Sequence, residues 1–249
     1  TERGIVWATT ANPTTVNTKI TNGTGTGNFS AAIASLPPAT LVHFRAYAIN
    51  SIGTSYGSNL TFTTNPALSA SSGQSNVSCF GGSNGTATVS PSGGLAPYTY
   101  SWSPAGGTGA TTSGLTAGAY TCTITDNEAT QIIRNFTIIQ PTAISVTPAS
   151  QTNVSCFGGS NGAAAINTPT GGAGGYTYNW TPGTPTGDGT TSVTGLSAGT
   201  WTCTVTDANG CTATQNFTIT APTAISVTPA SQTNVSCFGG SNGTASVTP

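Results

Sequence analysis

The decapeptide NVSCFGGSNG occurs three times, at residues 76–85, 153–162 and 234–243. The segment QPTAISVTPASQT at 140–152 also returns, as APTAISVTPASQT at 221–233. The chain therefore repeats itself with a period of roughly 80 residues, which is the size of one small β-sandwich. Such a period predicts an array of copies of one module, because a fold built around a single active site has no reason to repeat.

Apolar and hydroxyl side chains alternate along short segments of each repeat. In the first repeat the apolar positions are Tyr98, Tyr100, Trp102, Tyr120, Cys122, Ile124, Phe136 and Ile138. In the second repeat they are Tyr176, Tyr178, Trp180, Trp201, Cys203, Val205, Phe217 and Ile219. Alternation with period two indicates strands with one buried face and one wet face, as in antiparallel sandwiches. No segment has a sustained helical period, so the predicted fold class is all-β.

The junctions between repeats carry Pro141 and Pro222, which stiffen a linker without breaking a strand ladder. Ile144 and Val146 follow the first proline and suit the first strand of the next sandwich. Six extended residues reach only about 20 Å, which is too short for a free tether. We expect the sandwiches to lie end to end as a semi-rigid rod that carries tension along its axis.

Charged residues make up 4% of the chain, against about 25% in a typical soluble protein. Only four are Lys or Arg, and they are scattered, which excludes nucleic acid as a partner. No apolar run approaches the roughly 20 residues of a membrane helix, so membrane insertion is not expected. No signal peptide is predicted, because Thr1-Glu2-Arg3 leads directly into a strand-like run.

The cysteines recur with the repeats, which favours disulfides in an oxidising compartment. Cys79 and Cys122 are the only two in the first repeat, so any bond inside it must join them, and by equivalence Cys156 pairs with Cys203. Cys211 and Cys237 are then left unassigned. A zinc site is not expected, since one His and no CxxC pair are present. The remaining alternative is unpaired buried thiols.

The chain has few candidates for catalysis. Its carboxylates are Glu2, Asp126, Glu128, Asp188 and Asp207. Asp126 and Asp207 occupy the same position in two repeats, so they are expected to cap a hairpin through local N–H groups, with weak Ca²⁺ binding as the alternative. His43 has no nucleophile or orienting acid placed around it. We predict no catalytic residue, no cofactor and no metal, hence no enzyme.

Two features have a binding interpretation beside a structural one. The aromatic series Tyr98, Tyr100 and Trp102 could stack on a sugar, but its alternation with Thr and Ser favours a sandwich core. The glycine-rich loop Gly81–Gly85 could cradle an anion with its N–H groups. No phosphate-binding lysine follows it, so it is interpreted as a turn.

Residues 1–65 lack the decapeptide. Their corner Leu36–Thr40, strand Arg45–Asn50 and closing Phe62-Thr63-Thr64 resemble the second half of a fibronectin type III domain, whose opening strands would precede Thr1. The predicted domains are 1–65 for this partial sandwich, 66–141 and 142–222 for two repeats, and 223–249 for the start of a third repeat, cut short before its aromatic strand.

The combination of VSCFGGSNG, a GG pair before PYTYSW, and GLTAGAYTCTITD resembles the SprB repeat of gliding-bacterium adhesins over about 67–249. The second repeat adds TDANGC at 206–211, whereas the first departs from the pattern with TDNEAT at 125–130. The resemblance implies an extracellular filament attached to the outer membrane, exported by the type IX system and moved by the gliding motor. Related repeats also suggest a rival pairing of Cys156 with Cys211.

These observations predict a stalk and adhesive segment of a very long secreted surface adhesin, used for attachment and gliding. Its partners would be neighbouring repeats of the same chain, an extracellular substratum or polysaccharide, and, by resemblance, the gliding and secretion machinery. The alternative function is a carbohydrate-binding or spacer module of a secreted enzyme. The sequence does not identify the ligand.

Overall fold

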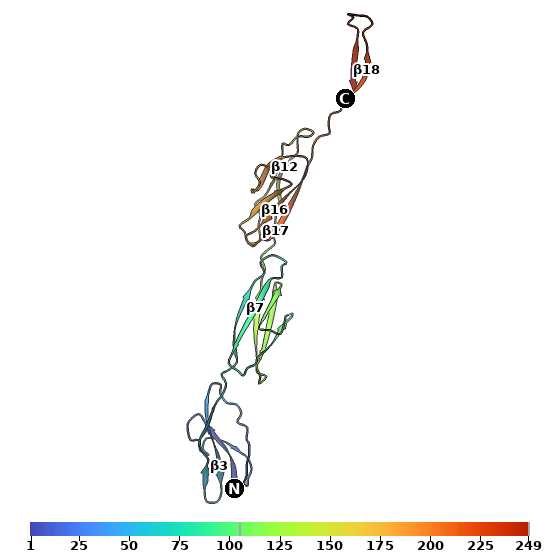
Figure 1. Cartoon of the computed structure of the whole chain (residues 1–249). Coiled ribbons are helices and arrows are strands. Elements are labelled where there is room, and N and C mark those ends of the chain that lie inside the picture. The colour runs from blue at the N-terminus through green and yellow to red at the C-terminus, as the bar shows by residue number, and fades with distance from the viewer. Residues whose placement is uncertain (105, 249) are drawn as a thin grey trace. The chain divides into compact units, whose positions relative to one another are not determined.

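The structure, a computed structural model, describes residues 1–104 and 106–248 (Figure 1). β-Strands joined by turns make up these residues, and nowhere among them is there a helix long and apolar enough to cross a bilayer. The all-β fold class is confirmed. It follows from the alternation of apolar and hydroxyl side chains, which buries one face of each strand and leaves threonines on the other.

By its contacts the chain divides into two compact units. The first comprises Thr1–Asn76 and Ser83–Ile139, and the second comprises Val77–Gly82 and Gln140–Pro249. The short segment Val77–Gly82 is thus grouped with the second unit, although it lies within the first copy of the decapeptide. The finer division into four domains stays a prediction.

The N-terminal part of the first unit is one five-stranded antiparallel sheet. Its strands are β1 (Glu2–Ala8), β2 (Thr18–Thr21), β3 (Leu41–Ile49), β4 (Thr54–Tyr56) and β5 (Leu60–Thr63). The order is β2-β1-β3-β4, and β5 also pairs with β3. Val6, Val42 and Tyr47 are buried on it. The fibronectin type III assignment of this region stays a prediction.

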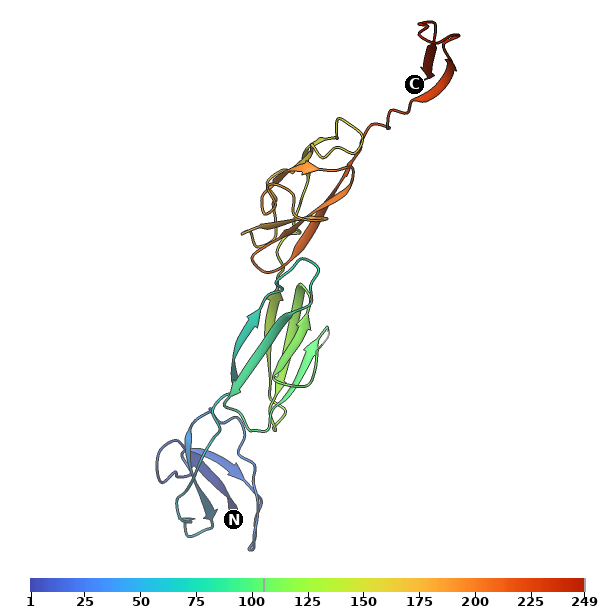
Figure 2. The same cartoon turned by 45° about the horizontal axis from the view of Figure 1, so that its top comes forward.

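The rest of the first unit contains two three-stranded antiparallel sheets. The strands are β6 (Ser69–Ser75), β7 (Gly85–Ser92), β8 (Thr99–Ser103), β9 (Thr111–Leu115), β10 (Gly118–Thr125) and β11 (Gln131–Ile138). One sheet has the order β6-β7-β9 and the other β11-β10-β8, and their arrows run lengthwise beside one another in Figure 2. The alternating apolar residues lie on β8, β10 and β11, as the period predicts, except for Tyr98, which directly precedes β8.

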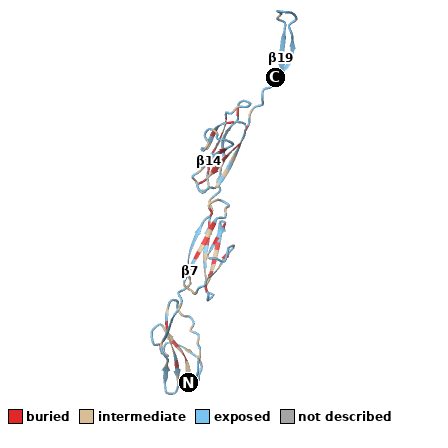
Figure 3. Ribbon diagram, viewed as in Figure 1, coloured by how far each residue is buried: buried red, intermediate tan, exposed pale blue. Residues whose placement is uncertain are grey.

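The core of these sheets uses an arrangement typical of immunoglobulin-like domains. Trp102 on β8 is buried opposite Cys122 on β10 and packs on Phe136, with ring centroids 5.3 Å apart. Tyr120 lies two residues before that cysteine and donates its hydroxyl to the carbonyl of Thr116, 3.2 Å away. This is the tyrosine corner of such folds. Figure 3 shows the buried residues in red along the strands.

The second unit contains the same pair of sheets. Its strands are β12 (Pro148–Thr152), β13 (Gly162–Ile166), β14 (Thr177–Thr181), β15 (Ser192–Leu196), β16 (Gly199–Thr206) and β17 (Thr212–Ile219). The orders β12-β13-β15 and β14-β16-β17 match those of the first repeat. Trp180 and Cys203 take the core positions of Trp102 and Cys122. Trp201 replaces the corner tyrosine and donates Nε1–H to the carbonyl of Ser197 at 3.0 Å.

The linker at 140–152 runs directly into the second sandwich. Ser145 and Thr170 form an antiparallel bridge, with N–H to O distances of 2.8 and 3.2 Å. Ile144 and Val146 are half-buried against the core of the second unit. The prediction that these two residues belong to the entry of the next sandwich is confirmed.

The third copy of the decapeptide connects β18 (Thr228–Thr233) to β19 (Thr244–Thr248), which form an antiparallel hairpin. These two strands correspond to β12 and β13 of the preceding repeat. Their side chains are exposed. The hairpin therefore shows the local structure of the decapeptide without a sandwich core beneath it.

Candidate functional site

The hairpin between β16 and β17 is organised by one buried carboxylate, Asp207. Its Oδ1 accepts the N–H groups of Asn209 and Cys211, both at 2.9 Å, and its Oδ2 accepts that of Ala173 at 2.8 Å. The Ala173 N–H contributes most to lowering the pKa of Asp207, burial opposes it, and the N–H groups of Cys211 and Asn209 lower it further. Asp207 thus holds the conformation of the turn and the position of Cys211 at its end.

Asp126 does the same in the first repeat. Its carboxylate accepts N–H groups from Leu95, Glu128 and Thr130 at 2.8–3.1 Å. Burial would raise the pKa of Asp126, but these three bonds outweigh it and the pKa is lowered. The predicted capping role of both aspartates is confirmed. Ca²⁺ needs oxygen ligands, whereas these carboxylates face N–H donors, and the described residues contain no cluster of three potential metal ligands.

The GG pair that precedes each aromatic strand is explained by the same carboxylate. Gly172 has φ +58°, and a Cβ built on it would lie 2.5 Å from Oδ2 of Asp207. Gly94, with φ +61°, stands in the same relation to Asp126. Any larger residue would have both an unfavourable backbone conformation and a clash with the carboxylate. The GG and TD motifs are therefore two halves of one contact.

Replacing Asp207 by Asn is expected to lower the melting temperature of the second unit by several degrees at neutral pH. The folded-state pKa lies below the unfolded value of about 3.9, so the stabilisation is present above that value and is lost as the pH falls through the folded-state pKa. The variant should consequently lose less stability than the unchanged chain when the pH is lowered from neutral to about 3. Thermal unfolding followed by circular dichroism at both pH values measures the difference.

The matched control is Glu128→Gln, since Glu128 is exposed on the corresponding hairpin of the first repeat. This change removes a charge of the same kind without removing the buried acceptor, so it should leave the melting temperature unchanged. If the melting temperature of Asp207→Asn and that of the unchanged chain depended on pH in the same way, the role given to Asp207 would be contradicted.

The decapeptide loop has the same conformation in its three copies. The N–H of Gly82 donates to the carbonyl of Cys79 at 3.0 Å, and Gly159 and Cys156 make the same bond at the same distance. Gly240 repeats it with Cys237 at 3.0 Å. The interpretation of the Gly81–Gly85 loop as a turn is confirmed. The turn places the side chain of the cysteine outside the strands.

A disulfide joins Cys79 of the first decapeptide to Cys211 of the β16–β17 hairpin, with Cα atoms 5.6 Å apart. Asn209 of this hairpin also donates Nδ2–H to the carbonyl of Ser78 at 3.0 Å. Gly81 donates its N–H to Oε1 of Gln140 at 2.7 Å. The bond thus sits among hydrogen bonds that hold the loop segment Val77–Gly82 in the second unit.

This disulfide contradicts the pairing that we derived by counting cysteines within each repeat. Cys122 and Cys203 are buried free thiols, and Cys156 and Cys237 are exposed free thiols, so the Cys79–Cys122 and Cys156–Cys203 bonds are wrong. Cys122 points into the core, whereas Cys79 lies in a loop outside it, and the facing strand β7 offers Ala87 and Val89 in place of a cysteine. The unassigned Cys211 is the one that forms the bond.

The rival pairing of Cys156 with Cys211 is wrong as well, for a geometric reason. Cys211 immediately precedes β17, while the loop of Cys156 lies beside the far end of that strand, where Asn153 Oδ1 accepts the N–H of Thr220 at 3.1 Å. Nine residues of strand span about 30 Å at about 3.3 Å each. A disulfide requires Cα atoms within about 7 Å.

The two core cysteines behave as small apolar side chains. Burial, followed by the nearby charge of Asp188, raises the pKa of Cys203 to about 11. Burial also raises the pKa of Cys122, against an opposing backbone hydrogen bond from Ser101. Thiols with raised pKa values are poor nucleophiles at neutral pH. The alternative of unpaired buried thiols therefore holds for Cys122 and Cys203.

The other polar candidates are distributed over separate structural contacts. Asp188 accepts the N–H of Trp180 at 2.8 Å, and Glu2 forms an ion pair with Lys19 at 2.8 Å. His43 on β3 bonds through Nδ1 to Asn59 at 3.0 Å. These groups lie on different elements and do not come together as an acid, a base and a nucleophile.

The aromatic series belongs to the core. Trp102 and Trp180 are buried, and their Nε1–H groups donate to the carbonyls of Gly109 and Thr190, both at 2.9 Å. The tyrosines at 98, 100, 176 and 178 are half-buried. Tyr98 donates its hydroxyl to the carbonyl of Gly93 at 2.6 Å. The core interpretation is supported over a sugar-stacking platform.

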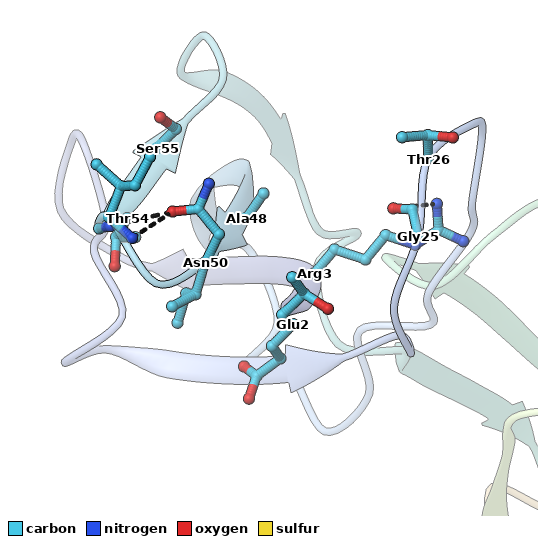
Figure 4. Close-up of a pocket in the computed structure, with 12 residues that line it drawn as sticks. Glu2, Arg3, Gly25, Thr26, Ala48, Asn50, Thr54 and Ser55 are labelled. Carbon is cyan, nitrogen blue, oxygen red and sulfur yellow. Dashed lines mark hydrogen bonds between the residues drawn. The ribbon is translucent and has the colours of Figure 1, made fainter.

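The N-terminal sheet has a groove of about 560 Å³ at the end of β1 and β3 (Figure 4). Arg3 lines it but donates to the carbonyls of Gly25 and Gly27 at 3.3 and 3.1 Å. Asn50 lines it too, and its Oδ1 accepts the N–H of Gly53 at 3.1 Å. Arg3 and Asn50 thus already have partners in the adjoining loops, and we assign no ligand to the groove.

Sequence reasoning missed the role of Cys211 and Asn209. One signal could have revealed it. The first repeat carries Thr130 in place of Cys211, and residues 1–64, which precede it, contain no cysteine. The second repeat carries Cys211, and the preceding repeat supplies Cys79. Hairpin and loop cysteines thus occur together across consecutive repeats.

Comparison with solved structures gives several matches of low TM-score. "Sidekick-1 immunoglobulin domains 1-5" is 13% identical with a TM-score of 0.31, and the match covers 92% of this chain and 56% of that one. The N-terminal eight immunoglobulin domains of Down Syndrome Cell Adhesion Molecule are 13% identical with a TM-score of 0.28, and the match covers 88% of this chain and 36% of that one. The complex of Dpr2 Ig1–Ig2 with DIP-Theta Ig1–Ig3 is 12% identical with a TM-score of 0.27, and the match covers 87% of this chain and 88% of that one. At these values the likeness does not extend to function.

The chain spans about half of the first of these structures and about a third of the second. Comparison with curated proteins gives no match. The family model of the SprB repeat matches residues 71–107, 149–185 and 230–249. Each of these segments contains one whole copy of the decapeptide. The chain thus contains immunoglobulin-like β-sandwiches, and three of its segments are similar to the SprB repeat.

Proposed function

We propose that this chain is a stalk and adhesive segment of a long cell-surface adhesin that serves attachment and gliding. The observation that carries the proposal is the match of three segments to the SprB repeat. It points to a structural or adhesive module at the cell surface. On this proposal the chain is extracellular, belongs to a filament attached to the outer membrane, and reaches the surface by type IX secretion.

The chemistry of the described residues is in keeping with this role. The aspartates bind backbone N–H groups, and the tryptophans fill the cores. The wet faces of the strands carry Thr and Ser, which interact with water without presenting charge. On this proposal the segment has no catalytic activity, and its partners are neighbouring repeats and an extracellular substratum or polysaccharide.

The proposal is tested with antibodies raised against the 249-residue chain. We expect them to label intact, unpermeabilised cells of the producing organism, and we expect their monovalent Fab fragments to reduce attachment and gliding. An antibody against a periplasmic protein is the control and should label only permeabilised cells. Labelling that requires permeabilisation contradicts a surface adhesin, and surface labelling without an effect of the Fab fragments contradicts a role in attachment.

The end-to-end arrangement of the sandwiches is the second part of the proposal. Small-angle scattering on the same chain distinguishes it from a compact body. A single globule of this length has a radius of gyration of about 18 Å, and a rod of successive sandwiches should have a value well above that. A value near the globular one would contradict the rod and, with it, the stalk.

A further inference from the structure

The loop of Cys156 has the sequence and the turn of the loop that forms the disulfide. Residues 153–162 repeat residues 76–85 without a change. The turn hydrogen bond is 3.0 Å in both, and Gly81 and Gly158 both have φ +72°. Cys79 is bonded to Cys211, whereas Cys156 is an exposed free thiol. The second loop therefore has the local structure of the first and lacks only its partner.

The partner of the first loop is a specific hairpin. Asp207 holds the hairpin in shape, Asn209 donates to the carbonyl of Ser78, and Cys211 forms the covalent bond. The corresponding carbonyl in the second loop is that of Ser155. In the first repeat, Glu128 and Thr130 stand where Asn209 and Cys211 stand in the second. The asparagine that donates the hydrogen bond and the cysteine that forms the disulfide are thus both present in the second repeat and both replaced in the first.

Loop and hairpin lie at opposite ends of one sandwich. In the second unit the hairpin precedes β17, and the Cys156 loop lies at the other end of β17, beside Thr220. A sandwich cannot join its own loop to its own hairpin, because the nine residues of strand between them span about 30 Å, at about 3.3 Å per residue. Each loop therefore needs a hairpin from a different module.

We propose that the Cys156 loop is a docking site for the TDANGC-type hairpin of another SprB-type module, closed by a disulfide with its cysteine. The bond forms between the two Sγ atoms, and both thiols lose their protons. The two electrons pass to an oxidant of the disulfide class, which is itself reduced to two thiols. The loop of Cys237 has the same sequence and takes the same kind of partner.

The test uses two variants of the full chain. In the first, Cys237→Ser leaves Cys156 as the one exposed thiol, with the Cys79–Cys211 bond intact. In the second, Cys79→Ser, Cys156→Ser and Cys237→Ser together leave Cys211 on its hairpin. Both keep the buried Cys122 and Cys203. The two chains differ in mass through a short tag and are mixed in a buffer of oxidised and reduced glutathione.

We expect the mixed dimer, linked from Cys156 to Cys211, to form in much larger amount than either homodimer. Its excess should be far above the statistical ratio that random coupling of the thiols would give. Adding Asn209→Ala to the second chain should slow its formation by about fivefold, the value of one hydrogen bond. Non-reducing electrophoresis and mass mapping of the linked peptides give both results. Glu128→Ala is the matched control for the asparagine, because it changes the same hairpin position in the first repeat.

A statistical mixture of dimers, glutathione adducts without dimers, or no effect of Asn209→Ala overturns the proposal, since the thiols would then react by exposure alone. Circular dichroism first establishes that both variants are folded. Cys79→Ala replaces Cys79→Ser should the serine variant unfold. The outcome is independent of the proposed adhesive function, because it reports only whether loop and hairpin recognise each other.

Discussion

Replacing Trp180 by alanine is expected to cost the second sandwich about 3–5 kcal/mol of unfolding free energy. Trp180 is fully buried, its ring packs on Phe217 at 5.5 Å between centroids, and it lies opposite Cys203 on the neighbouring strand. The change leaves a cavity and removes the donor to the carbonyl of Thr190. The total unfolding free energy of a small domain is about 5–15 kcal/mol, so the substitution removes a large share of it.

Hydrogen exchange of β16 and β17 measures the effect within this sandwich, where whole-chain unfolding would mix several transitions. The control is Phe157→Ala, because Phe157 is an aromatic residue of the same unit that is 68% exposed. It should change the stability by no more than about 0.5 kcal/mol. Protection in Trp180→Ala equal to that of the control would contradict the core position assigned to the tryptophan.

Replacing Cys79 by serine should lower the stability of the second unit by about 2–4 kcal/mol, the usual contribution of a native disulfide. The reason is that the bond ties the loop segment Val77–Gly82 to the β16–β17 hairpin. Hydrogen exchange of this hairpin is again the measurement. Dithiothreitol should destabilise the unchanged chain to the same level and have no further effect on the variant.

Cys156→Ser is the matched control, since it makes the same substitution in the same decapeptide at a cysteine without a bond. It should leave the exchange of the hairpin unchanged. If Cys79→Ser and Cys156→Ser have equal effects, the Cys79–Cys211 bond does not contribute to the stability of the unit.

Much of the fold could be predicted because the features that determine it involve residues close together in the sequence. The alternation along residues 98–102 and 120–124 fixes which side chains are buried, and that is a property of successive residues on one strand. The capping by Asp126 and Asp207 was predictable for the same reason, since an aspartate bonds N–H groups a few residues away. The entry of Ile144 and Val146 into the second sandwich needed only the linker's length and composition.

The disulfide could not be predicted by the same reasoning, because it depends on where the ends of strands lie. Counting cysteines within a repeat assumes that a repeat in the sequence is also the unit within which bonds form. Cys79 lies in the first repeat by sequence, yet its bond partner is 132 residues away. Only the position of Cys211 before β17 and of the decapeptide loop at the opposite end of a sandwich excludes bonds within one repeat.

The placement of entry and exit at opposite ends of the second sandwich has a mechanical consequence. The chain enters beside the hairpin, where Thr142 accepts the N–H of Gly172, and it leaves at the other end, after β17. A pulling force between these points acts along the strands, at right angles to the hydrogen bonds of the ladder. The eight residue pairs between β16 and β17 are then loaded in shear and must yield together instead of opening one after another.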